Sequence, residues 1–152
     1  MSKIGDLRKW IEAVEEMGEL RHIDGIDWDQ EIACVTELNR TRKHGPAFLF
    51  DDIKDYPRGF RILTSACKSP QRTALTFGLP IVKTDLEIVE LFRQKWDLWE
   101  SSAPQFPPKF VSSGPVLENI DSGDKVDLLK FPVPKWQPFN GGRYIGTGDA
   151  VI

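Results

Sequence analysis

Proline divides this 152-residue chain into two unlike parts, because seven of its eleven prolines lie between residues 104 and 138. Proline fixes φ and lacks a backbone N–H, so it ends helices and favours extended chain. We therefore expect a domain boundary near residue 103. Residues 1–103 are predicted to form an amino-terminal domain of α/β (α+β) class. Residues 104–152 are predicted to form a proline-rich linker and the beginning of an all-β unit.

Two helices of the first part have clear start signals. Apolar residues at helical spacing predict a helix over residues 4–17, capped by Asp6 or Ser2. Thr84 and Glu87 fit a capping box, which opens a helix that runs to about residue 100. A further helix is expected to begin at Asp27 or Asp29. Its apolar side consists of Trp28, Ile32, Val35 and Leu38, and Cys34 is expected to be half-buried on it.

Strands are predicted between these helices. Residues 19–23 and 60–64 are strand candidates, and the unbroken apolar run over residues 46–50 is typical of a strand buried on both faces. Ser69 followed by Pro70 starts a short helix. The order is therefore αβαββαα. We expect the core to contain Trp10, Ile11, Ile32, Val35, Phe48, Phe50, Ile62, Phe92 and Trp96.

The second part is predicted to contain short extended pieces over residues 115–134, including one over residues 126–129. Residues 143–152 look like a β-strand that ends on three apolar residues. Its unpaired edge needs a partner, so we expect two copies of the chain to dimerise through this strand.

Composition excludes several functions. The formal net charge is −3, and no basic run interleaves with aromatic residues, which argues against a nucleic-acid surface. No stretch approaches the roughly 20 apolar residues of a membrane span, and no signal-peptide core is present. Two cysteines provide no disulfide framework. We expect a cytoplasmic chain.

A glycine-rich stretch over residues 141–148 is the main candidate for ligand contact. It is neither a dinucleotide-binding fingerprint nor a P-loop, because no Lys-Ser/Thr pair and no helix follow it. From spacing alone, a plain turn into a strand explains it better than a phosphate cradle does. Thr147, between Gly146 and Gly148, is the one side chain there that is able to donate to a phosphate or ring oxygen.

Other candidates have simpler explanations. His22 and His44 lack cysteine or carboxylate neighbours at metal-ligand spacing, so we expect no metal ligands in this chain. Aspartate pairs occur at positions 27 and 29 and at positions 51 and 52. Caps and turn anchors explain them better than a carboxylate cluster does. The Trp96 and Trp99 pair is typical of a core or an interface. No catalytic residue is identified.

The same residues resemble the UbiD-type decarboxylases over essentially the whole chain. Similar stretches begin with Asp6-Leu-Arg-Lys-Trp-Ile-Glu and continue with Gly45-Pro-Ala-Phe-Leu-Phe-Asp-Asp-Ile and Tyr56-Pro-Arg-Gly-Phe-Arg-Ile-Leu-Thr. The most specific are Phe131-Pro-Val-Pro-Lys-Trp and Gly141-Gly-Arg-Tyr-Ile-Gly-Thr-Gly-Asp. Two positions depart from the family pattern: Asn140 stands where Asp is common, and Gln137 stands in a stretch where relatives often carry His.

This resemblance implies reversible, non-oxidative decarboxylation of aromatic or α,β-unsaturated acids on prenylated FMN, with Mn²⁺ and often K⁺. It also implies a split β-barrel of the flavin-reductase type, a flavin prenyltransferase that supplies the cofactor, and a homo-oligomer. Of the residues that line the cofactor, only Thr147 matches, with Gly146 and Gly148 as backbone supports. None of the family's catalytic or metal-binding residues has a counterpart here.

Family members are considerably longer. We therefore expect this chain to be the amino-terminal part of such an enzyme. It is expected to end within an early barrel strand, to be inactive alone and to hold flavin weakly. The alternative is a non-catalytic assembly subunit or binding module that completes a separate catalytic chain. A generic phosphate-binding domain built on the glycine stretch is a third, weaker reading.

Overall fold

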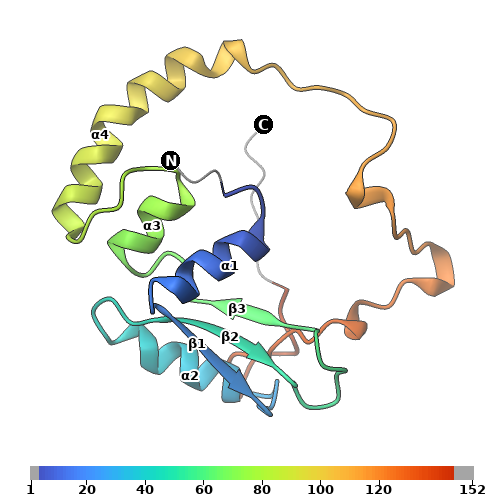
Figure 1. The fold of residues 1–152 in the computed structure, drawn as a ribbon. Coiled ribbons are helices and arrows are strands. Elements are labelled where there is room, and N and C mark those ends of the chain that lie inside the picture. The colour runs from blue at the N-terminus through green and yellow to red at the C-terminus, as the bar shows by residue number, and fades with distance from the viewer. Residues whose placement is uncertain (1–3, 146–152) are drawn as a thin grey trace.

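The computed structural model describes residues 4–145. Its helices and strands follow the predicted order αβαββαα and form a small α+β domain (Figure 1). The elements are α1 (Leu7–Glu16), β1 (Leu20–Asp24), α2 (Glu31–Arg40), β2 (Ala47–Asp51), β3 (Ile62–Thr64), α3 (Pro70–Thr76) and α4 (Asp85–Ser102).

Side-chain caps fix three of the helix starts. The Asp6 carboxylate accepts a hydrogen bond of 2.9 Å from an amide in the first turn of α1, and Ser69 caps α3 in the same way. At α4, the Thr84 hydroxyl accepts from the Glu87 amide while the Glu87 carboxylate accepts from the Thr84 amide, so the predicted capping box is present. These caps satisfy backbone donors that have no partner inside the helix.

The three strands form one sheet in the order β1-β2-β3. β1 and β2 are parallel and joined through α2, whereas β2 and β3 are antiparallel. The central strand β2 buries Ala47, Leu49 and Phe50, as its unbroken apolar sequence predicts.

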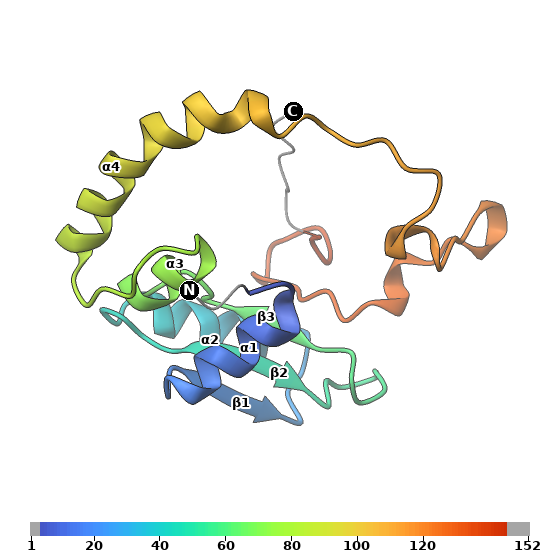
Figure 2. The same ribbon diagram turned by 45° about the horizontal axis from the view of Figure 1, so that its top comes forward.

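Helices cover both faces of the sheet. α1 and α3 lie on one face and α2 on the other (Figures 1 and 2). Because side chains alternate along a strand, Leu49 points to the α1 face and Phe50 to the α2 face. The α1 core contains Trp10, Val14, Leu20, Ala47 and Leu49, and the α2 core contains Ile26, Ile32, Phe50 and Ile53.

Arg72 ties the loops at one end of the sheet together. Its side chain is fully buried and donates to the Glu19 carboxylate at 2.5 Å. It also donates to the carbonyl oxygens of Gly45 at 2.6 Å and Ala66 at 2.9 Å. One side chain thus joins the residues before β1, before β2 and after β3.

The start of α2 differs from the prediction. The helix begins at Glu31, after Gln30 in a left-handed conformation with φ of 73°, because Asp27 and Asp29 build a turn instead of the first helical turn. Trp28 therefore lies outside the helix. Two further expectations for α2 are wrong: Leu38 is 69% exposed and Cys34 is exposed, since no element among residues 4–145 covers these side chains.

α4 packs on α3 through one face. Ile88 and the partly buried Phe92 and Trp99 contact this third cluster, which includes Ala74 and Leu79. Trp96, predicted to lie in the core, is 65% exposed because it lies off the helix face that carries Ile88, Phe92 and Trp99. Trp10, Ile32 and Phe50 are buried as predicted, whereas Ile11, Val35, Phe48, Ile62 and Phe92 are partly buried against the clusters.

After α4 the chain forms an open arch that returns to the sheet at residues 131–145 (Figures 1 and 2). The arch has single 3₁₀ turns at Pro115–Leu117, Gly123–Lys125 and Leu128–Lys130. The extended piece expected over residues 126–129 is confirmed only at Val126 and Asp127, because Leu128 and Leu129 lie in a 3₁₀ turn. Strands need a hydrogen-bonded neighbour, and the described part of the arch has none. Residues 143–145 are not in a strand, and residues 146–152 of that prediction lie outside the described residues.

Within residues 4–145, no helix combines the length and the apolar character needed to cross a membrane.

Candidate functional site

The returning segment, residues 131–145, is held against the turn that precedes α2. A parallel β-bridge pairs Asp29 with Lys135. The Gln30 amide donates to the Lys135 carbonyl, and the Lys135 amide donates to the Trp28 carbonyl, both at 3.1 Å. Backbone hydrogen bonds therefore fix the register of this segment on the α/β domain.

The turn itself is built by carboxylates. Asp27 accepts from the Asp29 amide at 2.9 Å, and Glu31 accepts from the Asp27 amide at 2.8 Å. A hydrogen bond from the Lys54 ammonium, followed by that of the Asp29 amide, lowers the pKa of Asp27. The ionised turn presents Trp28 at the surface, where its indole N–H donates to Asp55 at 3.3 Å.

Arg143 fastens the end of the segment to this turn. Its guanidinium carbon lies 3.5 Å from the Trp28 ring centroid and 5.6 Å from the Tyr56 ring centroid. The guanidinium donates to the Tyr56 hydroxyl, which in turn donates to the Leu129 carbonyl at 2.8 Å. We call Trp28, Tyr56 and Arg143 the aromatic clamp. Arginine suits this position because its planar group stacks on a ring and still donates at its edge.

An apolar groove of about 370 Å³ lies beside the clamp, between β3 and the returning segment. Its residues are Arg61, Ile62, Leu63, Thr64, Phe131, Pro132, Val133, Pro134, Trp136, Tyr144 and Ile145. Ligand sites in proteins are typically concave and mostly apolar, with few polar groups. The aromatic and aliphatic lining suits a planar ring system. In the sequence, Gly146, Thr147 and Gly148 follow directly after Ile145.

The predicted cofactor residues Gly146, Thr147 and Gly148 lie outside the described residues. The structure thus describes the chain up to the point where they begin. The departures Gln137 and Asn140 lie in a turn of the returning segment, where the Asn140 amide donates to the Gln137 carbonyl at 3.1 Å.

The other candidate residues have local partners. His22 lies 2.9 Å from Glu15, and His44 lies 3.6 Å from Asp85. Asp51 accepts from the Asp52 and Gly59 amides, so it anchors a turn, as expected. Among residues 4–145, no three His, Cys, Asp or Glu side chains gather as a metal site would require.

Sequence reasoning did not identify the aromatic clamp. Trp28 fits the apolar spacing of the predicted helix, and Tyr56 has no sequence signal beyond the family resemblance. The available signal was Arg143, a single cation within the glycine-rich stretch. Its partners lie far away in sequence, and no local pattern identifies them.

Sequence comparison places the chain in a known family. Residues 11–92 match the model of the 3-octaprenyl-4-hydroxybenzoate carboxy-lyase (UbiD) N-terminal domain, and residues 109–152 match that of the Rift-related domain. The pyrrole-2-carboxylic acid decarboxylase of Pseudomonas aeruginosa is 33% identical over 150 residues. That match covers 93% of this chain and 29% of the relative.

Solved structures agree. Vanillic acid decarboxylase from Sedimentibacter hydroxybenzoicus, in its closed form, has a TM-score of 0.76 at 26% identity, covering 95% of this chain and 30% of that one. The UbiD-class enzyme HmfF from Pelotomaculum thermopropionicum, in complex with FMN, has a TM-score of 0.64 at 23% identity, covering 91% and 28%. The likeness to HmfF supports a shared fold and nothing more.

The chain spans less than a third of the length of these relatives. One conclusion follows from the two family models matched in sequence, from a relative that is 33% identical over the aligned residues, and from the shared fold. The chain belongs to the UbiD family of carboxy-lyases and corresponds to the amino-terminal portion of its members.

Proposed function

We propose that this chain is the amino-terminal part of an enzyme that decarboxylates an aromatic or α,β-unsaturated carboxylic acid, reversibly and without oxidation, on prenylated FMN. Family membership and the decarboxylase names of two relatives support the reaction class. The flavin is supported by HmfF, which has been solved with FMN and, in an evolved dimeric form, with prenylated FMN.

One observation of the structure carries the proposal: the aromatic clamp holds Arg143, and the next two residues, Tyr144 and Ile145, line the apolar groove. In the proposal, a domain boundary lies near residue 103, and residues 104–152 comprise the linker and the first strands of a split flavin-binding barrel. The Thr147 hydroxyl donates to the flavin. Gly146 and Gly148 allow the backbone to approach it closely.

The groove fits a flavin in chemical type, because its walls are apolar and aromatic. When bound, prenylated FMN supplies the electron sink for loss of CO₂. The residues of this chain bind and orient it and exclude water, whereas no residue of the chain is assigned proton transfer. We assign no ligand for Mn²⁺ or K⁺ within residues 4–145, where no cluster of metal-ligating side chains occurs.

The test is an activity assay on the polypeptide encoded by the natural reading frame, produced together with a flavin prenyltransferase. Pyrrole-2-carboxylate, vanillate and a cinnamate serve as substrates, and CO₂ release is measured. Release from at least one acid, dependent on the prenylated flavin, is expected. A flavin-loaded protein that releases CO₂ from none of these acids contradicts the proposal.

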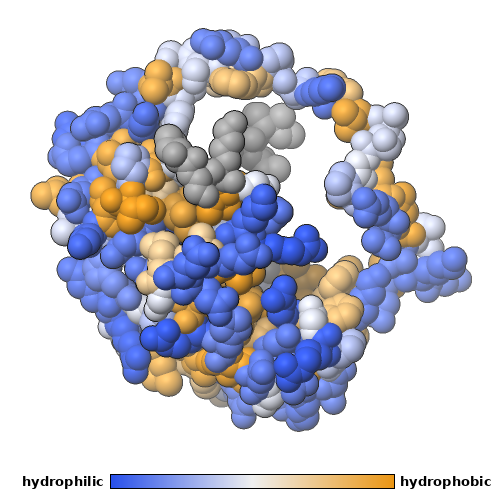
Figure 3. Space-filling view, in the orientation of Figure 1, coloured by the Kyte–Doolittle hydropathy of each residue, from blue (hydrophilic) through white to orange (hydrophobic). Residues whose placement is uncertain are grey.

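A second candidate function is that of a non-catalytic subunit that completes a separate catalytic chain. Exposed apolar side chains of α4 and the arch favour it, because Trp96, Phe106 and Phe110 are 65%, 77% and 95% exposed. Figure 3 shows apolar groups spaced along this arch. Such exposure indicates a partner surface, either on other parts of a longer polypeptide or on another chain. Co-purification of the chain with a separately encoded UbiD-like polypeptide distinguishes the two candidates.

A further inference from the structure

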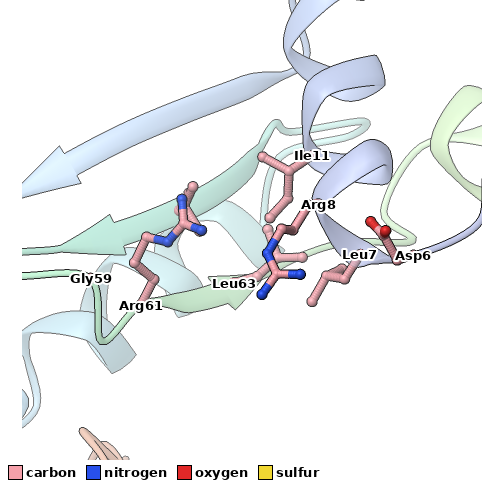
Figure 4. A pocket seen from close by; sticks show the side chains of 8 residues that line it. Asp6, Leu7, Arg8, Ile11, Gly59, Arg61 and Leu63 are labelled. Atoms are coloured by element: carbon pink, nitrogen blue, oxygen red, sulfur yellow. The ribbon is translucent and has the colours of Figure 1, made fainter. Parts of the chain in front are cut away.

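A second cleft, of about 450 Å³, lies on the opposite face of the sheet from α2, between the start of α1 and β3. Its lining is apolar at the floor and charged at the rim (Figure 4). The apolar residues are Leu7, Ile11, Leu49 and Leu63, and the charged residues are Asp6, Arg8 and Arg61. In Figure 4, Arg8 from the helix and Arg61 from the residues before β3 lie on two sides of Leu63.

The two arginines at this rim differ from most others in the chain. Among residues 4–145, a hydrogen bond or ion pair engages Arg21, Arg40, Arg58, Arg72, Arg93 and Arg143. Within the same residues, Arg8, Arg42 and Arg61 have no such partner, and two of these three line the same cleft. Two neighbouring cations repel each other, so an anion placed between them is favoured.

Two carboxylates interact with these arginines through charge, Asp6 with Arg8 and Asp51 with Arg61, but their hydrogen bonds go to backbone amides. Asp6 caps α1 by accepting from the Lys9 amide at 2.9 Å, and this hydrogen bond lowers the pKa of Asp6. Asp51 accepts from the Gly59 amide at 2.7 Å. Both remain ionised anchors of the backbone, so the guanidinium groups of Arg8 and Arg61 keep donors for a ligand.

We propose that Arg8 and Arg61 form a binding site for an aromatic carboxylate on the α1 face of the α/β domain, where Arg61 and Leu63 also border the apolar groove. Guanidinium groups recognise carboxylates through paired, charge-assisted hydrogen bonds. Ile11 and Leu63 offer the ring an apolar surface, which a small inorganic anion leaves uncovered. The choice of ligand rests on the proposed function, since aromatic acids are its substrate class, but binding here requires no flavin.

The experiment follows backbone amide shifts of the 152-residue chain in ¹⁵N-correlation spectra during titration with benzoate. Benzyl alcohol provides the ring without the charge, and acetate provides the charge without the ring. Saturable shifts are expected at Ile11, Leu63 and their neighbours with benzoate, at concentrations at least about tenfold lower than with either control, because charged hydrogen bonds and apolar contact add.

Substitutions at the rim identify the groups responsible. Arg8→Gln and Arg61→Gln are each expected to weaken benzoate binding about tenfold or more, because each removes a charged hydrogen bond. Arg61→Lys keeps the charge but loses paired donation, so a smaller loss is expected. Arg42→Gln, the matched control away from the cleft, leaves affinity unchanged.

Two results overturn the site. One is equal binding of benzoate and acetate, and the other is unchanged benzoate affinity in both glutamine variants. All three arginines are exposed, and unchanged amide shifts far from the cleft show that each variant is folded. Since no flavin and no turnover are involved, failure here leaves the proposed decarboxylase standing. If the activity assay fails instead, the benzoate titration still tests the site on its own.

Discussion

The guanidinium carbon of Arg143 lies 3.5 Å from the centre of the Trp28 indole ring, which joins the glycine-rich end of the described chain to the turn before α2. Next to this stack, the Gln30 amide donates to the Lys135 carbonyl and the Lys135 amide donates to the Trp28 carbonyl. The clamp therefore connects the segment preceding the proposed flavin contacts with the only sheet among residues 4–145.

Removing the clamp is expected to release the returning segment without unfolding the domain. A cation–π contact contributes about 0.5–2 kcal/mol, depending on its exposure. In Arg143→Ala, amide exchange at Gln30 and Lys135 should accelerate by up to about thirtyfold, as measured by hydrogen–deuterium exchange. Arg42→Ala, at an arginine without a partner among the described residues, serves as the control. Unchanged exchange at both amides in Arg143→Ala contradicts the assigned role of the clamp.

Arg72 is expected to be the most sensitive charged position in the domain. Burial lowers the pKa of Arg72, and the adjacent Glu19 opposes this shift, so the group is compensated only while its partners are present. Breaking one side of a buried pair typically costs about 3–5 kcal/mol. Urea unfolding of Glu19→Ala should therefore show a loss of about this size, and Glu19→Gln, which retains an acceptor, a smaller one. Equal stability of Glu19→Ala and the parent would show that the pair is dispensable.

Protonation of Asp51 in acid is expected to lower the free energy of unfolding. A hydrogen bond from the Gly59 amide holds the pKa of Asp51 below its ordinary 3.8. Because the folded pKa lies below the unfolded one, the stabilisation is present above pH 3.8 and is lost as pH falls through the folded value. Urea unfolding at pH 5 and at pH 3 is expected to show a smaller acid-induced loss in Asp51→Asn than in the parent. A pKa of Asp51 above 3.8, measured by NMR, would mean that protonation of this carboxyl stabilises the fold, which contradicts the prediction.

Much of the domain follows from local sequence, and the exceptions have a common cause. The caps at Asp6, Ser69 and Thr84 predict helix starts because each acts on amides in the next turn. Leu38 and Trp96 satisfy helical spacing yet lie exposed, because periodicity defines a helix face but not whether another element covers it.

The candidate site was predicted less well for the same reason. Asp27 and Asp29 were recognised as turn or cap residues, but their turn moves Trp28 out of the helix and makes it available to Arg143. That contact joins distant parts of the chain, and sequence spacing contains no information about it. Residues 115–134 contain 3₁₀ turns and no strand, because a strand needs a hydrogen-bonded neighbour.

The arch should be the first part of the chain to be cut by proteases. Residues 106–113 are all exposed, and no helix or strand includes them. Limited proteolysis is expected to cleave first between residues 101 and 114, which leaves a stable fragment close to residues 4–100. Mass spectrometry of the early products locates the cut. Primary cleavage within residues 84–100 would argue against a boundary near residue 103.

The central claim is that this chain supplies one wall of a prenylated-FMN site whose remaining walls lie elsewhere. Its most direct test is a titration with prenylated FMN, followed by flavin fluorescence. The titration compares the 152-residue chain with the polypeptide of the natural reading frame, including any separately encoded UbiD-like partner. We expect one flavin to bind per complete assembly, with an affinity that Thr147→Val lowers. The 152-residue chain alone is expected to bind flavin only weakly. Stoichiometric, sub-micromolar binding by the monomeric 152-residue chain would contradict it.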